Sequence, residues 1–293
     1  MQRVELLSHI EEELGGNVEE SQLAEIYTVR DLLDAALKSA AAGAAPGTRT
    51  TFAGWKAILA EEMTDPEVLA LKDPQPFFDV LWYPLSRLIQ MFTRDLFRLR
   101  VSGLENLPAK GPYIISSNHQ SYIDPVIMVS ALPKEIMENT FAVGTSEIFG
   151  EGFMRRLARW LRVMVLDPDA NLVPAMRAGA FGLKHGRILI LYPEGERSID
   201  GTPRIFKKGA AILSIHMQVP IVPVAIEGFY EVWPRGKKFF QKFNPMKMVF
   251  GKPIQPPPES EASEAAYEKL TADVKATVVE MWEGLHAPQT EEH

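Results

Sequence analysis

The 293-residue sequence contains no cysteine, which excludes disulfide bonds, thiolate metal sites and a cysteine nucleophile. It also lacks any run of 18 apolar residues. The best candidate, residues 76–97, is interrupted by two Asp and two Arg residues and is better suited to lie on a bilayer than to span one. The opening stretch, MQRVELLSHIEEEL, is charged and has no apolar core of the signal-peptide kind. The histidines show no metal-ligand spacing, so we expect no metal site.

Charge is unevenly distributed along the chain. The formal net charge is −7, but residues 1–75 sum to −8, residues 76–255 to +8 and residues 256–293 to −7. A basic middle segment favours anionic partners there, such as lipid phosphates or nucleic acid. No recognised nucleic-acid-binding motif is present, so we expect no nucleic-acid partner. The composition, 46% hydrophobic and 24% charged, is typical of a globular protein.

The N-terminal region differs from the rest. Residues 1–41 are predicted to form short helices, and residues 42–75 a small-residue linker followed by a helix. The order VELLSHIEEELG, NVEESQLAEIYTV, RDLLDAAL resembles the latter part of an acyl carrier protein domain. In such domains the phosphopantetheine serine would precede Met1, so the resemblance implies a truncated carrier segment from a longer polypeptide. The alternative is an acidic helical appendage.

From about residue 76, short apolar runs alternate with helical stretches. The runs are YIIS (113–116), TFAV (140–143), VMVL (163–166), RILILY (187–192), PIVPVAI (220–226) and KMVF (247–250). This alternation predicts an α/β domain over residues 76–258, with a central, mostly parallel sheet flanked by helices. Residues 259–293 are predicted to form an acidic C-terminal helix and tail.

Two polar loops follow predicted strands. The first loop carries Asn118, His119 and Asp124. The second loop and the segment after it carry Glu194, Gly195, Arg197, Ser198, Lys207 and Lys208. Because the carboxyl ends of parallel strands meet at one rim, we expect the two loops to lie together. A histidine beside a carboxylate can take a proton from a hydroxyl, glycine lets backbone approach a ligand, and arginine and lysine suit phosphate oxygens.

These loops resemble motif blocks of the glycerolipid acyltransferases, the family that contains the lysophosphatidic acid acyltransferases. The Asn-His-x4-Asp block is met at 118–124, the Glu-Gly-x-Arg-Ser block at 194–198, and the late valine-proline-glycine block by VPIVPVAIEG at 219–228. The resemblance spans roughly residues 85–255. It implies that His119 is the general base and Asp124 orients it. It further implies substrate contacts from Asn118, Glu194, Gly195, Arg197, Ser198, Lys207 and Lys208.

The implied reaction transfers a fatty acyl group from acyl-CoA or acyl carrier protein to the free hydroxyl of a lysophospholipid such as 1-acylglycerol-3-phosphate. It needs no acyl-enzyme and no cofactor beyond the acyl donor. One block departs from the family, because RVMVLDPDAN has Asp167, Pro168 and Asp169 where an arginine usually helps to hold the phosphate. Arg162, Arg177 and Arg204 are candidate replacements. A different acceptor, such as lysophosphatidylethanolamine, and a non-catalytic lipid- or carrier-binding module stay open as alternatives.

Two amphipathic segments fit a lipid substrate. Phe149, Phe153, Leu157 and Trp160 fall on one side of a predicted helix whose other side carries arginines. Such a helix suits an anionic membrane surface or an acyl-chain groove, and the alternative is a core-packed helix with a solvated arginine face. The same choice applies to the aromatic stretch 76–97, where membrane docking is favoured. We therefore expect a cytoplasmic protein that docks peripherally on the inner face of the cytoplasmic membrane.

Overall fold

The computed structural model describes residues 52–73, 76–144, 158, 162–166, 172–237 and 239–286. Residues 1–55 and 56–293 form two compact units, and the fold described below is that of the second. The expectations for the carrier-like segment, the linker up to residue 51 and the C-terminal tail beyond residue 286 lie outside the described residues.

Seven strands among the described residues form one sheet in the order β1-β7-β6-β2-β5-β3-β4. The strands are β1 (Arg100–Ser102), β2 (Tyr113–Ser117), β3 (Thr140–Gly144), β4 (Val163–Val165), β5 (Ile188–Leu191), β6 (Ile221–Glu227) and β7 (Lys247–Phe250). All neighbouring pairs are parallel except β6 and β7. The sheet is therefore the mostly parallel one that the sequence predicted.

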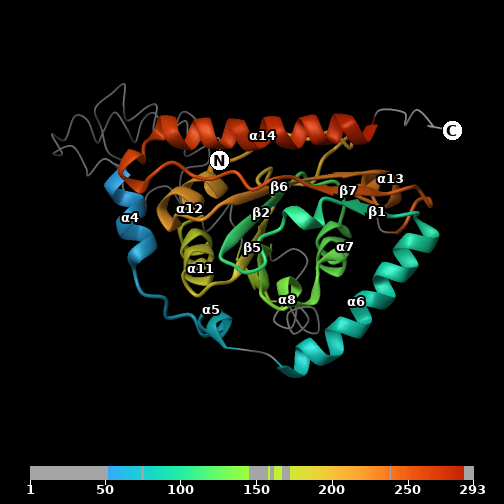
Figure 1. The fold of residues 1–293 in the computed structure, drawn as a ribbon, viewed down its shortest axis with the longest axis horizontal. Coiled ribbons are helices and arrows are strands. Elements are labelled where there is room, and N and C mark those ends of the chain that lie inside the picture. The colour runs from blue at the N-terminus through green and yellow to red at the C-terminus, as the bar shows by residue number, and fades with distance from the viewer. Residues whose placement is uncertain are drawn as a thin grey trace, which may run out of the picture. The chain divides into compact units, whose positions relative to one another are not determined.

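Helices cover both faces of this sheet (Figure 1). The helices among the described residues are α4 (Phe52–Ala60), α5 (Pro66–Leu69), α6 (Pro76–Leu96), α7 (Asp124–Ala131), α8 (Lys134–Met137), α11 (Leu172–Lys184), α12 (Gly209–Met217), α13 (Phe229–Val232) and α14 (Glu264–His286), with short 3₁₀ turns at Ala70–Lys72, Leu104–Asn106 and Glu259–Glu261. The chain moves from β2 to β3 through α7, then back across the sheet through α11 and α12. Right-handed crossovers in opposite directions place α7 on one face and α11 and α12 on the other.

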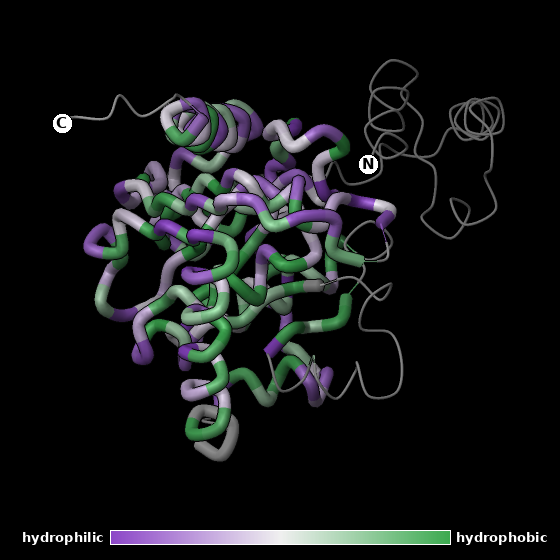
Figure 2. The backbone as a smooth tube through the Cα atoms, turned by 90° about the vertical axis from the view of Figure 1, so that its right-hand side faces the viewer, coloured by the Kyte–Doolittle hydropathy of each residue, from purple (hydrophilic) through white to green (hydrophobic). Residues whose placement is uncertain are grey.

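The central strand β2 shows why this arrangement is stable. All five of its residues are buried, as expected for a parallel strand covered on both faces. Tyr113 and Ile115 pack in one cluster with Ile127 and Met128 of α7. Hydrophobic residues fill the interior of the unit, whereas hydrophilic residues concentrate toward its periphery (Figure 2). The C-terminal ends of β5, β2 and β6 consequently lie side by side, with β2 in the middle.

Helix α6 packs one side against α7 and exposes an apolar stripe on the other. Trp82, Ser86 and Thr93 are buried. The exposed apolar side chains are Val80, Leu81, Leu85, Leu88, Met91, Phe92 and Leu96. The Arg87 guanidinium donates hydrogen bonds to the carbonyls of Ser130 (2.7 Å) and Leu132 (2.9 Å), which satisfies the C-terminal end of α7. Among the helices of the described ranges, none is long and apolar enough to cross a bilayer.

Candidate active site

His119 and Asp124 are brought together by the turn between β2 and α7. The Asp124 Oδ2 lies 2.7 Å from the His119 Nδ1 and also accepts the backbone N–H groups of Gln120 (2.6 Å) and Ser121 (2.8 Å). The Asp124 side chain is fully buried, and it starts α7, where the helix dipole favours a negative charge. Hydrogen bonds to a charged group contribute about 1.5–3 kcal/mol each, so three of them offset much of the cost of burying this carboxylate.

Tyr192, at the end of β5, supports the other side of the histidine. Its ring stacks on the His119 ring with centroids 4.1 Å apart and an interplanar angle of 22°. The Tyr192 hydroxyl is buried and has no hydrogen-bond partner within the described structure. Burial, helped by the negative charge of Asp124, raises the pKa of Tyr192 well above its usual value, so the phenol stays neutral. Sequence reasoning missed this residue. The signal available in the sequence was the pair of apolar runs that form β2 and β5. Because these strands pair in parallel, the residues that follow them, His119 and Tyr192 among them, lie at the same edge of the sheet.

Glu194 connects the second loop to the first. Its side-chain Oε1 accepts the backbone N–H of His119 at 3.3 Å, and the residue is only 5% exposed. Burial raises the pKa of Glu194 to about 7, although backbone hydrogen bonds from Arg204 and His119 and the charge of Arg204 oppose this rise. The second oxygen, Oε2, is buried without a hydrogen-bond partner in the described part of the chain. The Glu194 carboxyl is therefore partly protonated near neutral pH.

The backbone of His119 is held on both sides. Its carbonyl accepts the N–H of Ser198 at 2.7 Å, which ties the two loops together. Asn118, which is fully buried, donates to the carbonyl of Ile226 (3.0 Å) and accepts the N–H of the same residue (2.8 Å). The Asn118 amide is therefore committed to β6, and the late motif block contributes by receiving it. This geometry fits a positioning residue, not the substrate contact expected from the sequence.

Gln120 and Ser121 join further loops to this centre, and both are buried. The Gln120 amide donates to the carbonyl of Gly201 (2.6 Å) and to the Glu227 carboxylate (3.1 Å), and its oxygen accepts the N–H of Phe229 (3.1 Å). The Ser121 hydroxyl donates to the carbonyl of Trp233 at 2.7 Å. These contacts make the rim a rigid platform, as a precisely oriented histidine requires.

Arg197 directly precedes Ser198, whose N–H donates to the His119 carbonyl, and its charged group lies over an aromatic ring. Its guanidinium carbon lies 3.6 Å from the centroid of the Tyr122 ring. No ion pair involving Arg197 is found among the described residues. The neighbouring Ser198 hydroxyl instead donates to the carbonyl of Thr202 (2.8 Å) and accepts the N–H of Gly201 (2.9 Å). Ser198 therefore shapes the turn, and Arg197 is left able to bind an anion.

The remaining residues of the second loop divide into two locations. Gly195 has φ of +75°, and a Cβ there would lie 2.4 Å from the Lys207 Nζ, so the lysine side chain passes directly over the glycine. Lys208 lies elsewhere, because its ammonium group contacts Glu264 and Glu268 of α14. Burial alone would lower the pKa of Lys208, but the hydrogen bonds to these two carboxylates raise it. The substrate contact expected of Lys208 does not fit this position, which joins α12 to α14.

The three arginines expected to replace the missing phosphate ligand all have protein partners. Arg162 is buried and donates to the carbonyl of Glu138. Arg204 pairs with the Glu196 carboxylate at 3.1 Å. Arg177 pairs with Glu61 (2.9 Å) and donates to the carbonyl of Glu62 (3.0 Å). The altered positions 167–169 lie outside the described residues.

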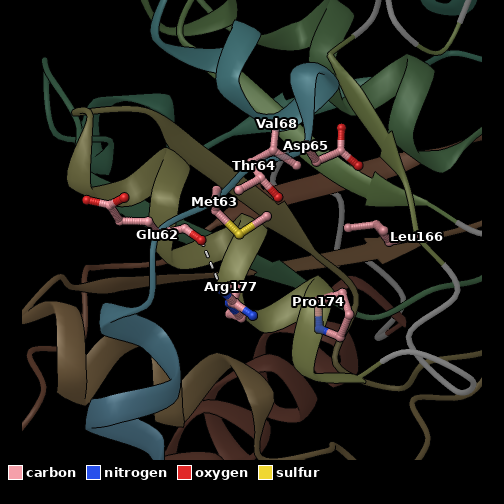
Figure 3. A pocket seen from close by; sticks show the side chains of 8 residues that line it. All are labelled: Glu62, Met63, Thr64, Asp65, Val68, Leu166, Pro174 and Arg177. Carbon is pink, nitrogen blue, oxygen red and sulfur yellow. Dashed lines mark hydrogen bonds between the residues drawn. The ribbon is translucent and has the colours of Figure 1, made fainter.

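Arg177 lines a separate pocket of about 130 Å³ (Figure 3). The other lining residues are Glu62, Met63, Thr64, Asp65, Val68, Leu166 and Pro174. None of these residues contacts His119 or Asp124, so this pocket is separate from the candidate active site. The four aromatic and aliphatic residues expected to contact acyl chains, Phe149, Phe153, Leu157 and Trp160, lie outside the described part of the chain.

The central part of the chain is similar to known proteins. Residues 98–227 match the family model described as Acyltransferase. Human 1-acyl-sn-glycerol-3-phosphate acyltransferase alpha is 30% identical over 163 residues, covering 53% of this chain and 56% of that protein. The chloroplastic 1-acyl-sn-glycerol-3-phosphate acyltransferase BAT2 of Brassica napus is 28% identical over 179 residues, covering 61% and 49%. The match thus spans about half the length of these two relatives.

A bacterial relative and a solved structure extend the comparison. The 1-acyl-sn-glycerol-3-phosphate acyltransferase of Bacillus subtilis (strain 168) is 26% identical over 157 residues, covering 53% of this chain and 73% of that protein. The crystal structure of the 1-acyl-sn-glycerophosphate acyltransferase PlsC from Thermotoga maritima aligns with a TM-score of 0.59 at 23% identity, covering 82% of this chain and 97% of that one. At this identity the structural likeness establishes the fold.

Proposed function

We propose that the domain containing residues 98–227, which match the family model described as Acyltransferase, transfers a fatty acyl group from a thioester donor to the free hydroxyl of a lysophospholipid. The observation that carries the proposal is the 2.7 Å contact between His119 and Asp124 on the platform built by the two motif loops. The named relatives support 1-acylglycerol-3-phosphate as the acceptor.

His119 is the general base in the proposed mechanism. Asp124 occupies its Nδ1, which leaves Nε2 to take the proton of the acceptor hydroxyl. The hydroxyl oxygen then forms a bond to the thioester carbonyl carbon, and the resulting tetrahedral intermediate collapses by breaking the carbon–sulfur bond. The departing thiolate takes the proton back from the imidazolium. Asp124 stabilises the imidazolium while it exists, and no acyl-enzyme forms.

The surrounding residues orient the reactants. Tyr192 fixes the plane of the imidazole, Glu194 accepts the backbone N–H of His119, and the Asn118 side chain ties the preceding residue to β6. Arg197, whose charge has no carboxylate partner within the described ranges, is proposed to bind the phosphate of the acceptor. Gly195 is proposed to allow close backbone approach, with Lys207 above it adding positive charge.

The acceptor and donor both sit at a lipid surface in this proposal. The exposed apolar stripe of α6 has no covering element among the described residues, and side chains at this spacing suit insertion into the interfacial region of a bilayer. The basic middle of the chain favours an anionic membrane. We therefore propose peripheral docking through α6.

The test is a transfer assay with the purified full chain. Radiolabelled acyl-CoA and acyl carrier protein are supplied separately, each against a panel of lysophospholipids that includes 1-acylglycerol-3-phosphate and lysophosphatidylethanolamine. We expect transfer that falls at least a thousandfold in His119→Ala and about 10²–10⁴-fold in Asp124→Asn. His185→Ala, at an exposed histidine at the end of α11, is the matched control and should keep full activity.

The panel also separates the alternatives. Preference for another head group would assign a different acceptor to the same mechanism. If the folded protein binds lipid but transfers no acyl group from any donor, the result would favour a non-catalytic lipid- or carrier-binding module. Equal activity in wild type and His119→Ala would remove the general-base role.

A further inference from the structure

An aromatic loop lies beside the candidate active site, formed by residues 233–243 apart from residue 238, which is not described. Its three phenylalanines are among the most exposed apolar side chains: Phe239 is 75% exposed, Phe240 56% and Phe243 72%. Lys237 and Lys242 are interleaved with them and are exposed. Such large rings are normally buried, so a cluster of them in water marks a contact surface.

The aromatic loop is fixed in shape. The Trp233 indole N–H donates to the carbonyl of Lys237 at 2.7 Å, and the N–H of Gln241 donates to the carbonyl of Val232 at 2.8 Å. The Gln241 side chain closes a further turn by donating to the carbonyl of Phe239 at 2.7 Å. The phenylalanines are therefore presented by an ordered loop, and their exposure does not reflect missing local hydrogen bonds.

A line of aromatic contacts joins this loop to the site. Arg197 lies over Tyr122, and the Tyr122 and Trp233 rings have centroids 5.5 Å apart. Trp233 in turn contacts Phe240, with centroids 5.0 Å apart. Ser121, three residues before Asp124, donates to the Trp233 carbonyl. The loop thus continues the platform that carries His119.

The same loop reaches the exposed apolar stripe of α6. Phe97, directly after the end of α6, contacts Phe240 and Phe243 with ring centroids 6.1 and 5.3 Å away. In Figure 1 the C-terminal end of α6 and helix α13, which leads into the loop, lie close together. Ring contacts therefore link the end of α6, through Phe97 and Phe240, to Trp233 beside the site.

We propose that the aromatic loop is a second lipid-contacting element, which docks on an anionic phospholipid bilayer and sets the mouth of the site against it. This rests on the proposed function, because only a lipid substrate gives the site a reason to face a bilayer. Phenylalanine rings enter the interfacial region, while the lysine side chains contact lipid phosphates. Neither Lys237 nor Lys242 has an ion-pair partner among the described residues, so both charges are available. Arg235, by contrast, is held by Glu196 at 2.6 Å.

The absence of cysteine from the chain allows a direct test, because a single introduced thiol carries a probe at one known place. Phe239→Cys is labelled with the environment-sensitive fluorophore NBD in the otherwise unchanged full chain. Vesicles of phosphatidylcholine alone are compared with vesicles that also contain phosphatidylglycerol. We expect blue-shifted, stronger NBD emission with the anionic vesicles and quenching by lipids brominated in their acyl chains.

The matched control carries NBD at Ala276→Cys, an exposed position on α14. It should show no shift with either vesicle. An unchanged spectrum at position 239 in the presence of vesicles that bind the protein would overturn the proposal, and so would an equal response at position 276.

Two double variants, one at the phenylalanines and one at the lysines, test the contact by vesicle binding and acyl transfer. Phe239→Ser with Phe243→Ser, and Lys237→Glu with Lys242→Glu, are each expected to weaken binding to anionic vesicles at least tenfold. Both should keep wild-type transfer to a short-chain, monomeric lysophospholipid in solution. If the lysine variant instead loses transfer only from acyl carrier protein and binds vesicles normally, the loop docks a protein and the proposal is wrong.

The two proposals fail in different ways. If the wild type transfers no acyl group to any acceptor but the probe at position 239 enters anionic bilayers, the proposed reaction is contradicted and the proposed lipid contact is supported. If transfer proceeds but the probe at position 239 stays in water, the lipid contact falls and the reaction stands.

Discussion

The imidazole of His119 is held between Asp124, which contacts Nδ1 at 2.7 Å, and Tyr192, whose ring stacks 4.1 Å away. The carboxylate fixes the tautomer and rotation of the imidazole, and the phenol ring covers one of its faces. Nε2 is consequently the nitrogen left for the acceptor hydroxyl in the proposed mechanism, and the two contacts restrict rotation of the ring. This support comes from the start of α7 and from the end of β5, which makes the histidine part of a rigid site.

Tyr192 is expected to act through its ring. Tyr192→Leu removes the stack and should lower kcat about tenfold with a smaller change in KM, because misplacing a catalytic group weakens the chemical step more than binding. Tyr192→Phe keeps the stack and removes a buried hydroxyl that has no partner in the described structure. It should keep wild-type kcat and raise the free energy of unfolding by about 1–2 kcal/mol. Steady-state kinetics and urea unfolding measure both. A large loss of kcat in Tyr192→Phe would assign a role to the hydroxyl instead.

Glu194 should make stability depend on pH. Its pKa is about 7 in the folded chain and near 4.5 when exposed, so the folded state keeps a proton that the unfolded state has lost between these values. Its contribution is fully present below about pH 4.5 and is lost as pH rises through about 7, by up to about 3 kcal/mol.

Glu194→Gln, which is neutral throughout, isolates this effect. The free energy of unfolding of the wild type relative to the variant should fall between about pH 5 and pH 8. Urea unfolding followed by tryptophan fluorescence at both pH values checks it. A difference between the two proteins that stays constant with pH would show that the carboxyl titrates normally.

Asn118 is expected to matter for stability before it matters for binding. Asn118→Leu leaves the N–H and the carbonyl of Ile226 buried without partners and should lower the free energy of unfolding by about 2–4 kcal/mol. Because the same residue precedes His119, kcat should fall as well, while KM for the acceptor changes little. A loss of stability below about 0.5 kcal/mol, or a rise confined to KM, would return Asn118 to the substrate-binding role.

Arg197 and Lys208 should respond differently, although both were expected to bind substrate. Arg197→Lys keeps the charge but loses the planar group that lies over Tyr122, so KM for the acceptor should rise about tenfold. Lys208→Gln breaks half-exposed ion pairs to α14, and should change stability by less than about 1 kcal/mol and KM not at all. Kinetics of the two variants with one acceptor would decide, and equal effects on KM would contradict this assignment.

The strands were predictable because burial on both faces leaves a clear trace in the sequence. A run such as YIIS in β2 contains no charge and is bounded by polar loops, and the structure places a strand at 113–117. The helix at 264–286 likewise lies within the C-terminal segment that the sequence predicted to be helical. The parallel arrangement followed from the alternation of strands with helices, which also predicted that the two motif loops share a rim.

By itself, the sequence determined the fold class, the His119–Asp124 pair and the Glu194–Ser198 loop, because these depend on local spacing and on strand ends. Only the tertiary structure decided which polar groups are free. Asn118 and Lys208 carry side chains suited to a substrate, yet one is bound to β6 and the other to α14. Tyr192 became part of the site through its position on the neighbouring strand. The sequence gives the chemical type of each side chain. The partners of Asn118 and Lys208 lie more than 50 positions away along the chain, and only folding brings them within hydrogen-bonding distance.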